Sequence, residues 1–211
     1  EIIKETLWYK NVFLVGGCIR DSLLDEDISD IDLFVSVPRG ALRFTSWLKS
    51  KDLIFDDYQY FKRFGTTKFR FKKYPDLEFD VSFPHHRLEC KKGKNYSKEQ
   101  ELQYMTEDCL LRDLTINSLY QHVSTGKILD FSKKGLGDLK NHIIRNTSDP
   151  AIIYGENPAC MIRVVRFSVK YGWEMSSETR QGLFDHVNLT AAIALGIYDY
   201  AAEKGITDYK E

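Results

Sequence analysis

The stretch from residue 14 to 36, LVGGCIRDSLLDEDISDIDLFVS, places the strongest constraint on what this chain can fold into. An apolar run reaches a double glycine, Gly16-Gly17, as a buried strand does when it enters a tight turn. A short segment with helical spacing follows, and a second apolar run then starts around Asp30 and Asp32. Side chains two residues apart on a strand point to the same face. The spacing therefore predicts a strand, a turn, a helix and a second strand that presents two carboxylates together.

Paired carboxylates on one strand face are typical of a cation site, because two negative charges a few ångströms apart repel each other. Hard divalent ions such as Mg²⁺ prefer oxygen ligands and keep open positions for substrate phosphates. Asp80 stands in another apolar run, LEFDVSF, and it can join Asp30 and Asp32 if the two strands are neighbours. Three carboxylates on one sheet face could then form a two-metal phosphoryl-transfer site.

The double glycine strengthens the functional interpretation of these acids. A DxD pattern alone is common by chance in surface turns. A glycine turn that leads into a helix, however, forms a cradle in which backbone N–H groups point at phosphate. A cradle and an acidic pair this close together in sequence predict that the chain binds a phosphorylated substrate through a metal ion.

The rest of the first half predicts further strands of a mixed sheet. Alternating patterns favour strands at 67–71 and 77–83, with a turn at Pro75-Asp76 between them. A helix followed by a short strand is expected between residues 38 and 54.

The second half of the chain has a different pattern. A polar, lysine-rich stretch at 91–101 predicts a solvated loop, and helical patterns dominate after it. These patterns cover residues 108–120, 136–141, 157–171 and 177–204. The order of a sheet and then helices predicts an α+β fold. A boundary near residue 149 divides a sheet domain, residues 1–149, from a helical domain, residues 150–211.

Composition narrows the function without identifying it. The formal net charge is −1, so an anionic partner must be held by a local basic patch rather than by the field of the whole protein. No apolar run approaches the roughly 18–20 residues of a membrane span, and the first residues do not resemble a signal peptide. The four cysteines are too dispersed for a zinc site or a disulfide framework. We therefore expect free thiols, no membrane and a cytoplasmic location.

The stretch at 14–36 resembles the signature of class II nucleotidyltransferases, the CCA-adding tRNA nucleotidyltransferases and the related bacterial poly(A) polymerases. The matching residues are Gly16, Gly17, Arg20, Asp21, Leu23, Leu24, Asp30 and Asp32. The segment LLRDLTINSL is similar to a second family motif through Arg112, Asp113, Thr115, Asn117 and Leu119. Three other segments extend the resemblance over residues 11–175: SFPHHRLE with Arg87 and Glu89, ILDFSKKGLGDLKNHIIR, and RVVRFSVKYGW with Arg163 and Arg166.

The resemblance implies a polymerase-β-like nucleotidyltransferase head with a mixed sheet, followed by a short helical neck. It also implies a reaction in which NMP passes from an NTP, ATP or CTP, to an acceptor hydroxyl. In the family this hydroxyl is an RNA 3′ end, above all that of tRNA, and two Mg²⁺ ions are held by residues corresponding to Asp30, Asp32 and Asp80. The implied nucleotide-binding residues are Gly16, Gly17, Arg20, Asp21, Arg112, Asp113, Asn117, Asn157, Arg163 and Arg166.

Each of these residues also has a simpler interpretation. Arg163 and Arg166 could be solvated surface charges. Asn117 could be a hydrogen-bonded core amide, and Arg112-Asp113 could be a local ion pair of little energetic value. The order and spacing of all the motifs, rather than any single residue, carry the functional inference.

Three departures from the family pattern leave alternatives open. Leu111 stands where the family has an arginine, and Asn157 and Cys160 stand at the aspartate and arginine that read the base. An asparagine amide has a donor in place of one acceptor, and a thiol cannot supply a guanidinium fork, so relaxed or altered base preference is expected. The chain is also shorter than the usual family member. Two alternatives remain: the same transfer to a protein or small-molecule acceptor, and a non-catalytic nucleotide-binding relative.

Overall fold

The computed structural model describes residues 2–28, 30–62, 64–83 and 97–188. The strands are β1 (Val12–Val15), β2 (Ile31–Val35), β3 (Gln59–Phe61), β4 (Thr66–Phe71), β5 (Tyr74–Ser82), β6 (Tyr120–His122), β7 (Ile128–Leu129), β8 (Ile143–Ile144) and β9 (Glu174–Met175). The α-helices are α1 (Gly17–Leu23), α2 (Gly40–Ser50), α3 (Lys98–Leu110), α4 (Gly135–Asn141), α5 (Pro150–Glu156), α6 (Ala159–Tyr171) and α7 (Ser177–Asp185). Short 3₁₀ helices cover Leu7–Lys10 and Thr115–Asn117.

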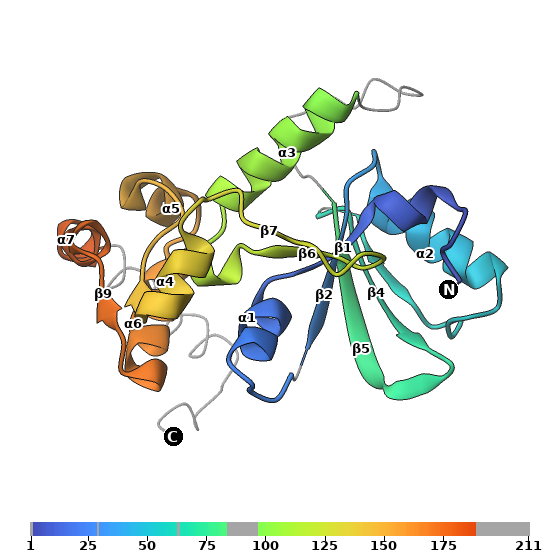
Figure 1. Ribbon diagram of the computed structural model, residues 1–211, viewed down its shortest axis with the longest axis horizontal. Helices are drawn as coiled ribbons and strands as arrows, with labels where there is room; N and C mark the ends of the chain where they lie inside the picture. The colour runs from blue at the N-terminus through green and yellow to red at the C-terminus, as the bar shows by residue number, and fades with distance from the viewer. Residues whose placement is uncertain (1, 29, 63, 84–96, 189–211) are drawn as a thin grey trace, which may run out of the picture.

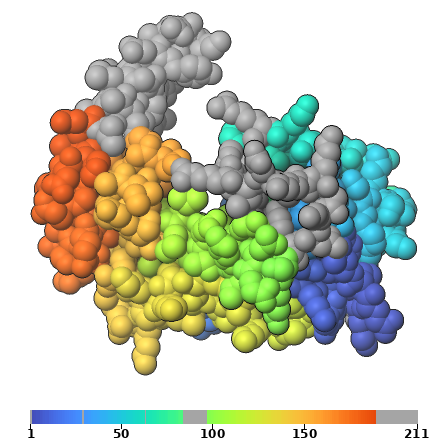
Figure 2. All heavy atoms as spheres, turned by 90° about the horizontal axis from the view of Figure 1, so that it is seen from above, coloured from blue at the N-terminus to red at the C-terminus, as the bar shows by residue number. Residues whose placement is uncertain are grey.

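One seven-stranded mixed sheet organises the fold, in the order β3-β4-β5-β2-β1-β6-β7, and the predicted α+β class is confirmed. Figure 1 shows the sheet and α2 on one side of the molecule and the helices α4 to α7 on the other. Figure 2 shows the same division from above, with the orange-to-red segment after residue 150 at the end opposite the blue N-terminal residues. None of the described helices combines the length and the apolar character needed to cross a membrane.

The strand, turn, helix and strand expected within residues 14–36 are present. β1 leads into Gly16, whose φ is +84°, and α1 begins at the next residue. Glycine adopts a positive φ without a steric penalty, which allows this tight entry into the helix. α1 is anchored by Cys18 and Ile19, which pack against Leu119.

The sheet register brings distant residues into one row. β1 is antiparallel to both β2 and β6, and it pairs Val15 with Asp32 on one side and with Tyr120 on the other. β2 is parallel to β5 and pairs Asp32 with Asp80. Paired residues on neighbouring strands point to the same face of a sheet. Tyr120, Val15, Asp32 and Asp80 therefore lie side by side across four strands.

The opposite face of the sheet forms the first hydrophobic core. Phe44 and Leu48 of α2 pack there against Phe69, Val81 and their neighbours. Burial of such side chains stabilises the fold by about 1.5–3 kcal/mol each relative to leaving them exposed. This core fixes which face of each strand is buried, and it thereby leaves the row of acids on the other face.

A second core crosses the expected domain boundary. It joins Leu114 and Ile144, which precede residue 149, to Val164 and Phe167 of α6. The division at residue 149 stays a prediction. The shared core means that α6 is held by residues of the sheet-bearing part of the chain.

The turn expected at Pro75-Asp76 is wrong. Both residues lie inside β5, and the turn falls at residues 72–73. The register between β4 and β5 shifts at Arg70 and Phe71, opposite the start of β5. Proline has no backbone N–H to contribute to the ladder, and a bulge is one of the few places in a sheet that tolerates it.

The helix expected at 108–120 is also wrong. α3 lies earlier, because Ser97 and Gln100 form a capping box that begins the helix at Lys98. After α3 the chain makes a short 3₁₀ turn and enters β6, so that β6 and β7 join the sheet after a helix. The sheet therefore does not end before the helices start.

Some expectations lie wholly or partly outside the described residues. Arg87 and Glu89 fall there, as does most of the lysine-rich stretch at 91–101, whose last residues belong to α3 instead of a loop. Within 177–204, α7 confirms the start of the expected helix, and residues after 188 are not described.

Two glycines of α4 test how closely this helix packs. A Cβ on Gly135 would lie 2.6 Å from the carbonyl oxygen of Thr115, whereas one on Gly137 would meet nothing within 4 Å. We expect Gly135→Ala to lower the free energy of unfolding by about 1–3 kcal/mol through overpacking. Gly137→Ala should raise it by about 0.5–1 kcal/mol, because glycine in an exposed helix interior costs entropy. Urea unfolding of both variants measures this, and equal effects would contradict the close packing.

Candidate functional site

A cleft of about 680 Å³ collects almost every residue that the sequence assigned to a site. Its walls come from α1, the approach to β2, the segment between α3 and β6, and the helices α5 and α6. The predicted residues that line it are Gly16, Gly17, Arg20, Asp21, Asp30, Asp32, Arg112, Asp113, Asn117, Asn157, Arg163 and Arg166. Asp80 does not line the cleft, and it lies one strand beyond Asp32.

The glycine turn brings backbone close to a carboxylate. A Cβ on Gly16 would lie 3.2 Å from Oδ2 of Asp32 and 3.9 Å from Nη1 of Arg112. A side chain at this position would thus fill the space between an acid and a base at the floor of the cleft. The turn keeps that space open for a ligand.

The acids form a row of like charges. Asp32 faces Asp80 in register on the neighbouring parallel strand, and Asp30 precedes it on the approach to β2. Burial raises the pKa of Asp32 above its usual value, and the charges of Asp80 and Asp30 raise it further. Arg112 and Arg163 oppose this effect on the pKa without cancelling it. Asp80 itself is half exposed and pairs with Lys68 at 3.3 Å.

The donor set fits a divalent cation that is also bound by its substrate. Among the described residues, no three His, Cys, Asp or Glu side chains converge closely enough to hold a metal ion by themselves. Mg²⁺, however, usually takes one or two carboxylates and fills its other positions with water and substrate phosphates. The mutual repulsion of Asp32 and Asp80 is the kind that such a cation relieves. The candidate ligands are therefore Asp30, Asp32 and Asp80.

Arg20 is fully engaged by protein groups. Its side chain donates to both carboxylate oxygens of Asp21, at 2.8 and 2.9 Å, and to Oδ1 of Asn117 at 2.5 Å. Its guanidinium also lies 4.7 Å from the centroid of the Phe167 ring, and only 6% of the residue is exposed. In this structure Arg20 joins α1 to the 3₁₀ turn and to α6. The phosphate contact that the resemblance implies for Arg20 stays a prediction.

The ion pairs of the LLRDLTINSL motif are not local. Asp113 pairs with Arg163 of α6 at 3.1 Å, and Arg112 pairs with Asp108 at 3.0 Å. Asp113 also accepts a hydrogen bond from the backbone N–H of Leu114. The simpler interpretation of Arg112-Asp113 as a mutual pair is wrong. Arg163 is half exposed but ion-paired, so it is more than a solvated surface charge.

The two departures from the base-reading motif have structural counterparts. Oδ1 of Asn157 accepts a hydrogen bond from the backbone N–H of Ala159, at 3.1 Å, just before α6 begins. Cys160 is buried and belongs to the second core, and burial raises the pKa of its thiol. Asn157 therefore offers an amide in place of a carboxylate, and Cys160 has no guanidinium, so the two side chains do not reproduce the aspartate and arginine pair that the resemblance implies.

Several other cleft residues were not among the predicted site residues. Asp27, Glu156, Phe167 and Lys170 also line the cleft. Helical spacing alone could have found Lys170, because it follows Arg163 and Arg166 on one side of α6. Lys170 pairs at 2.9 Å with Glu26, in the loop between α1 and β2.

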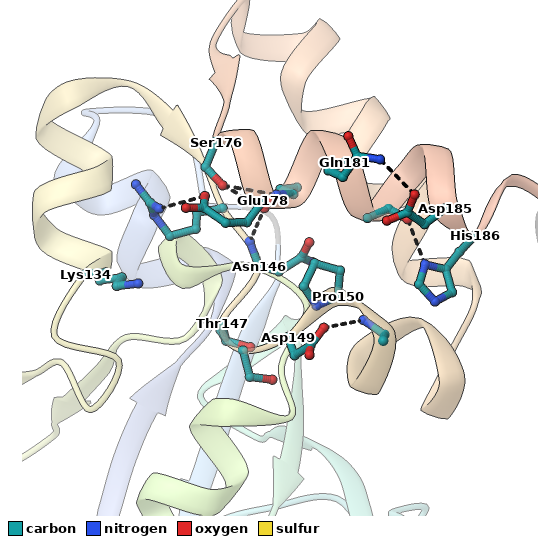
Figure 3. Close-up of a pocket in the computed structure, with 15 residues that line it drawn as sticks. Lys134, Asn146, Thr147, Asp149, Pro150, Ser176, Glu178, Gln181, Asp185 and His186 are labelled. Atoms are coloured by element: carbon teal, nitrogen blue, oxygen red, sulfur yellow. Dashed lines mark hydrogen bonds and ion pairs between the residues drawn. The ribbon is translucent and has the colours of Figure 1, made fainter.

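A second cavity, of about 580 Å³, lies between α5, α7 and the segment before α5 (Figure 3). Its polar groups contact each other: Arg145 pairs with Glu178 at 3.6 Å, and Gln181 donates to Asp185 at 2.8 Å. Asp149 accepts from the backbone N–H of Ala151 and caps α5. None of the predicted site residues lines this cavity, so the cleft beside Asp32 is the candidate site.

A mixed sheet that carries aspartates in register beside a glycine turn is the arrangement that the motif resemblance implies for a nucleotidyltransferase head. Residues 12–145 match the family described as the Poly A polymerase head domain, and the chain belongs to that family. The resemblance stated from the motifs is therefore confirmed.

Individual relatives agree with this assignment. The chain is 27% identical to the CCA-adding enzyme of Limosilactobacillus fermentum, over 87% of this chain and 42% of the relative. It is 30% identical to Poly(A) polymerase I of Escherichia coli O157:H7, over 80% of this chain and 36% of the relative.

Solved structures show the same similarity. A CCA-adding enzyme in complex with CTP superposes with a TM-score of 0.69 at 26% identity, covering 86% of this chain and 41% of that one. A tRNA nucleotidyltransferase with a primer tRNA and an ATP analog gives 0.68 at 26% identity, covering 90% and 49%. The chain thus spans less than half the length of these relatives.

The raised pKa of Asp32 predicts that the ionised side chain lowers the stability of the folded protein. The folded protein binds the Asp32 proton more tightly than the unfolded chain, so stability falls as pH rises from about 4, the ordinary aspartate pKa, to the raised value. We expect Asp32→Asn to be more stable than the wild type at neutral pH, and this gain to vanish below that window. Urea unfolding at several pH values measures it, with the exposed Asp76→Asn as a control. An Asp32→Asn variant that is less stable at pH 7 would contradict the repulsion.

Proposed function

We propose that this protein is a template-independent nucleotidyltransferase that moves NMP from an NTP to an acceptor hydroxyl, with an RNA 3′ end, above all that of tRNA in the cytoplasm, as the acceptor. The observation that carries the proposal is the register of Asp32 opposite Asp80, beside the Gly16-Gly17 turn at the floor of the cleft. The ligands of similar solved structures, CTP, an ATP analog and a primer tRNA, support it. We extend the proposal to a head of residues 1–149 and a helical neck of residues 150–211.

The acidic residues would bind metal ions, and the basic residues of the cleft would bind the phosphates. Asp30, Asp32 and Asp80 would hold two Mg²⁺ ions, which in such sites polarise the phosphoryl group and lower the pKa of the attacking hydroxyl. Gly16 leaves room for the triphosphate, because any side chain there would approach Asp32. Arg112 would offset phosphate charge from the α3 side of the cleft, and Arg163 would do so from α6.

α6 would also contribute Arg166 and Lys170 to the charge of the cleft. Both line the cleft from the same helix. Asp113 and Arg163 neutralise each other in the described conformation, so a triphosphate would compete with Asp113 for the guanidinium. Asn117 would be presented to the ribose by Arg20, which holds its Oδ1.

The altered base-reading positions favour one variation on this proposal. Because Asn157 and Cys160 do not present the family's hydrogen-bonding pattern, the acceptor could differ from tRNA while the chemistry stays the same. Incubation with each labelled NTP, total RNA and cell protein would show where the label is transferred. A protein that binds MgNTP and labels nothing would instead be the non-catalytic relative.

Loss of the central acids should abolish transfer. We expect Asp30→Ala and Asp32→Ala to lower NMP transfer by at least about a thousandfold, since the metals supply several kcal/mol of transition-state stabilisation. Chelation by EDTA should have the same effect on the wild type, and added Mg²⁺ should restore activity. Asp76→Ala, on an exposed part of β5, is the matched control and should retain wild-type activity. Substantial transfer by a folded Asp32→Ala variant would refute the site.

Base selection should be weaker than the family motif would give. A good bidentate contact to a base edge contributes about 1–3 kcal/mol of discrimination, and Asn157 and Cys160 cannot make the family's pair of contacts. We expect single-NTP incorporation rates to differ by less than about tenfold between the preferred base and at least one other base. An assay with each of the four NTPs on RNA that ends at the discriminator base measures this. Strict addition of C, C and then A would contradict it.

A further inference from the structure

Two residues that do not line the cleft, Asp108 and Tyr120, contact the Nε side of the Arg112 guanidinium. Nε of Arg112 lies 3.0 Å from Oδ2 of Asp108 and 3.4 Å from the hydroxyl of Tyr120. The hydroxyl of Tyr120 also bonds to the same oxygen of Asp108, which closes a triangle of contacts. Arg112 lines the cleft, whereas neither Asp108 nor Tyr120 does. We call these three residues the Arg112 clamp.

The hydrogen-bond directions in the clamp are determined by burial. Tyr120 is fully buried, and burial raises the pKa of its hydroxyl well above the usual value. The phenol therefore stays protonated and donates to Asp108, while it accepts from Nε of Arg112. The guanidinium also lies over the Tyr120 ring, 5.4 Å from its centroid. Nε is thus occupied within the clamp, and Nη1 lies near Gly16 at the cleft.

The sheet register ties the clamp to the acids. Tyr120 pairs with Val15, and Val15 pairs with Asp32, so Tyr120 and Asp32 lie in one row with a single strand between them. At the usual spacing of strands their backbones are about 10 Å apart. Arg112 extends into this gap: its Nε contacts Tyr120, and its Nη1 lies 3.9 Å from the point where a Cβ of Gly16 would stand, which is itself 3.2 Å from Oδ2 of Asp32.

Helix stability does not account for Asp108. It lies in the last turn of α3, where a carboxylate faces the negative end of the helix dipole and no basic residue of that turn offsets it. An acid at this position therefore costs stability unless a cation pairs with it. Arg112, four residues later, is that cation, and its side chain is only 24% exposed.

We propose that Asp108 and Tyr120 are positioning residues that fix the guanidinium of Arg112 toward the phosphates of the nucleotide. An arginine side chain has several rotatable bonds, and the entropy lost when a ligand orders it weakens binding. The clamp orders Arg112 before the nucleotide arrives. This inference rests on the proposed function, because it assigns Arg112 to a nucleotide triphosphate.

The test removes one hydroxyl and uses a matched tyrosine as the control. Tyr120→Phe keeps the ring under the guanidinium and removes both hydrogen bonds of the hydroxyl. Tyr154 is also fully buried, and its hydroxyl donates to Asn146 at 2.8 Å, away from the cleft. We expect Tyr120→Phe and Asp108→Asn to raise the Kd of MgATP about tenfold. Tyr154→Phe should leave that Kd unchanged even if it lowers the melting temperature.

A double-mutant cycle separates positioning from folding. In an Arg112→Met background the clamp has nothing to orient, so Tyr120→Phe should cause no further change in the Kd of MgATP. An unchanged Kd in Tyr120→Phe, or an equal loss with and without Arg112, would overturn the inference. Because binding is measured without turnover, a wild type that binds MgATP and transfers nothing would refute the proposed function and leave the clamp in place.

Discussion

The parallel pairing of β2 with β5 is the constraint on which the rest of the site depends. It places Asp32 opposite Asp80. A shift of β2 by one residue would turn Asp32 into the hydrophobic core under α2, and the same shift of β5 would turn Asp80 into it. The core therefore specifies the register, and the register forces two like charges together. Burial raises the pKa of Asp32, and the charge of Asp80 raises it further. Gly16, Arg112 and Arg163 all lie where they leave room for these acids or offset their charge.

Sequence patterns predicted the parts of the site that are local. The glycine turn, α1 and the paired acids depend on neighbouring residues, and alternation placed Asp80 on the correct face of its strand. The strand order that makes Asp80 a neighbour of Asp32 depends on contacts between distant parts of the chain. From the sequence we could therefore say only that Asp80 joins the other acids if the two strands are neighbours. The misplaced helix at 108–120 has a similar cause. Apolar spacing there reflects three different burial environments, the end of α3, a 3₁₀ turn and β6, instead of one helical face.

The roles of the charged residues were harder to predict than their presence in the site. The order of the motifs predicted Arg20, Arg112 and Arg163 as site residues, and all three line the cleft. No rule of sequence spacing, however, identifies the residues with which they pair. Arg20 is held by Asn117, which is 97 positions away, and Arg163 is held by Asp113. Both contacts depend on tertiary packing, and the pair of Arg163 with Asp113 requires α6 to pack against the sheet-bearing part of the chain. The site is thus completed by tertiary packing, although most of its residues belong to recognisable motifs.

α6 belongs to the second core on one side and to the cleft on the other. Met161 and Val164 are buried in the core, whereas Arg163, Arg166 and Lys170 border the cleft. Changes at the cleft-facing positions would alter the ligand surface without creating a cavity in the core. Substitutions at these positions can therefore change the proposed nucleotide site while the fold is preserved. Cys160 lies where the two sides meet, because it lines the cleft and is also packed into the second core that stabilises the protein.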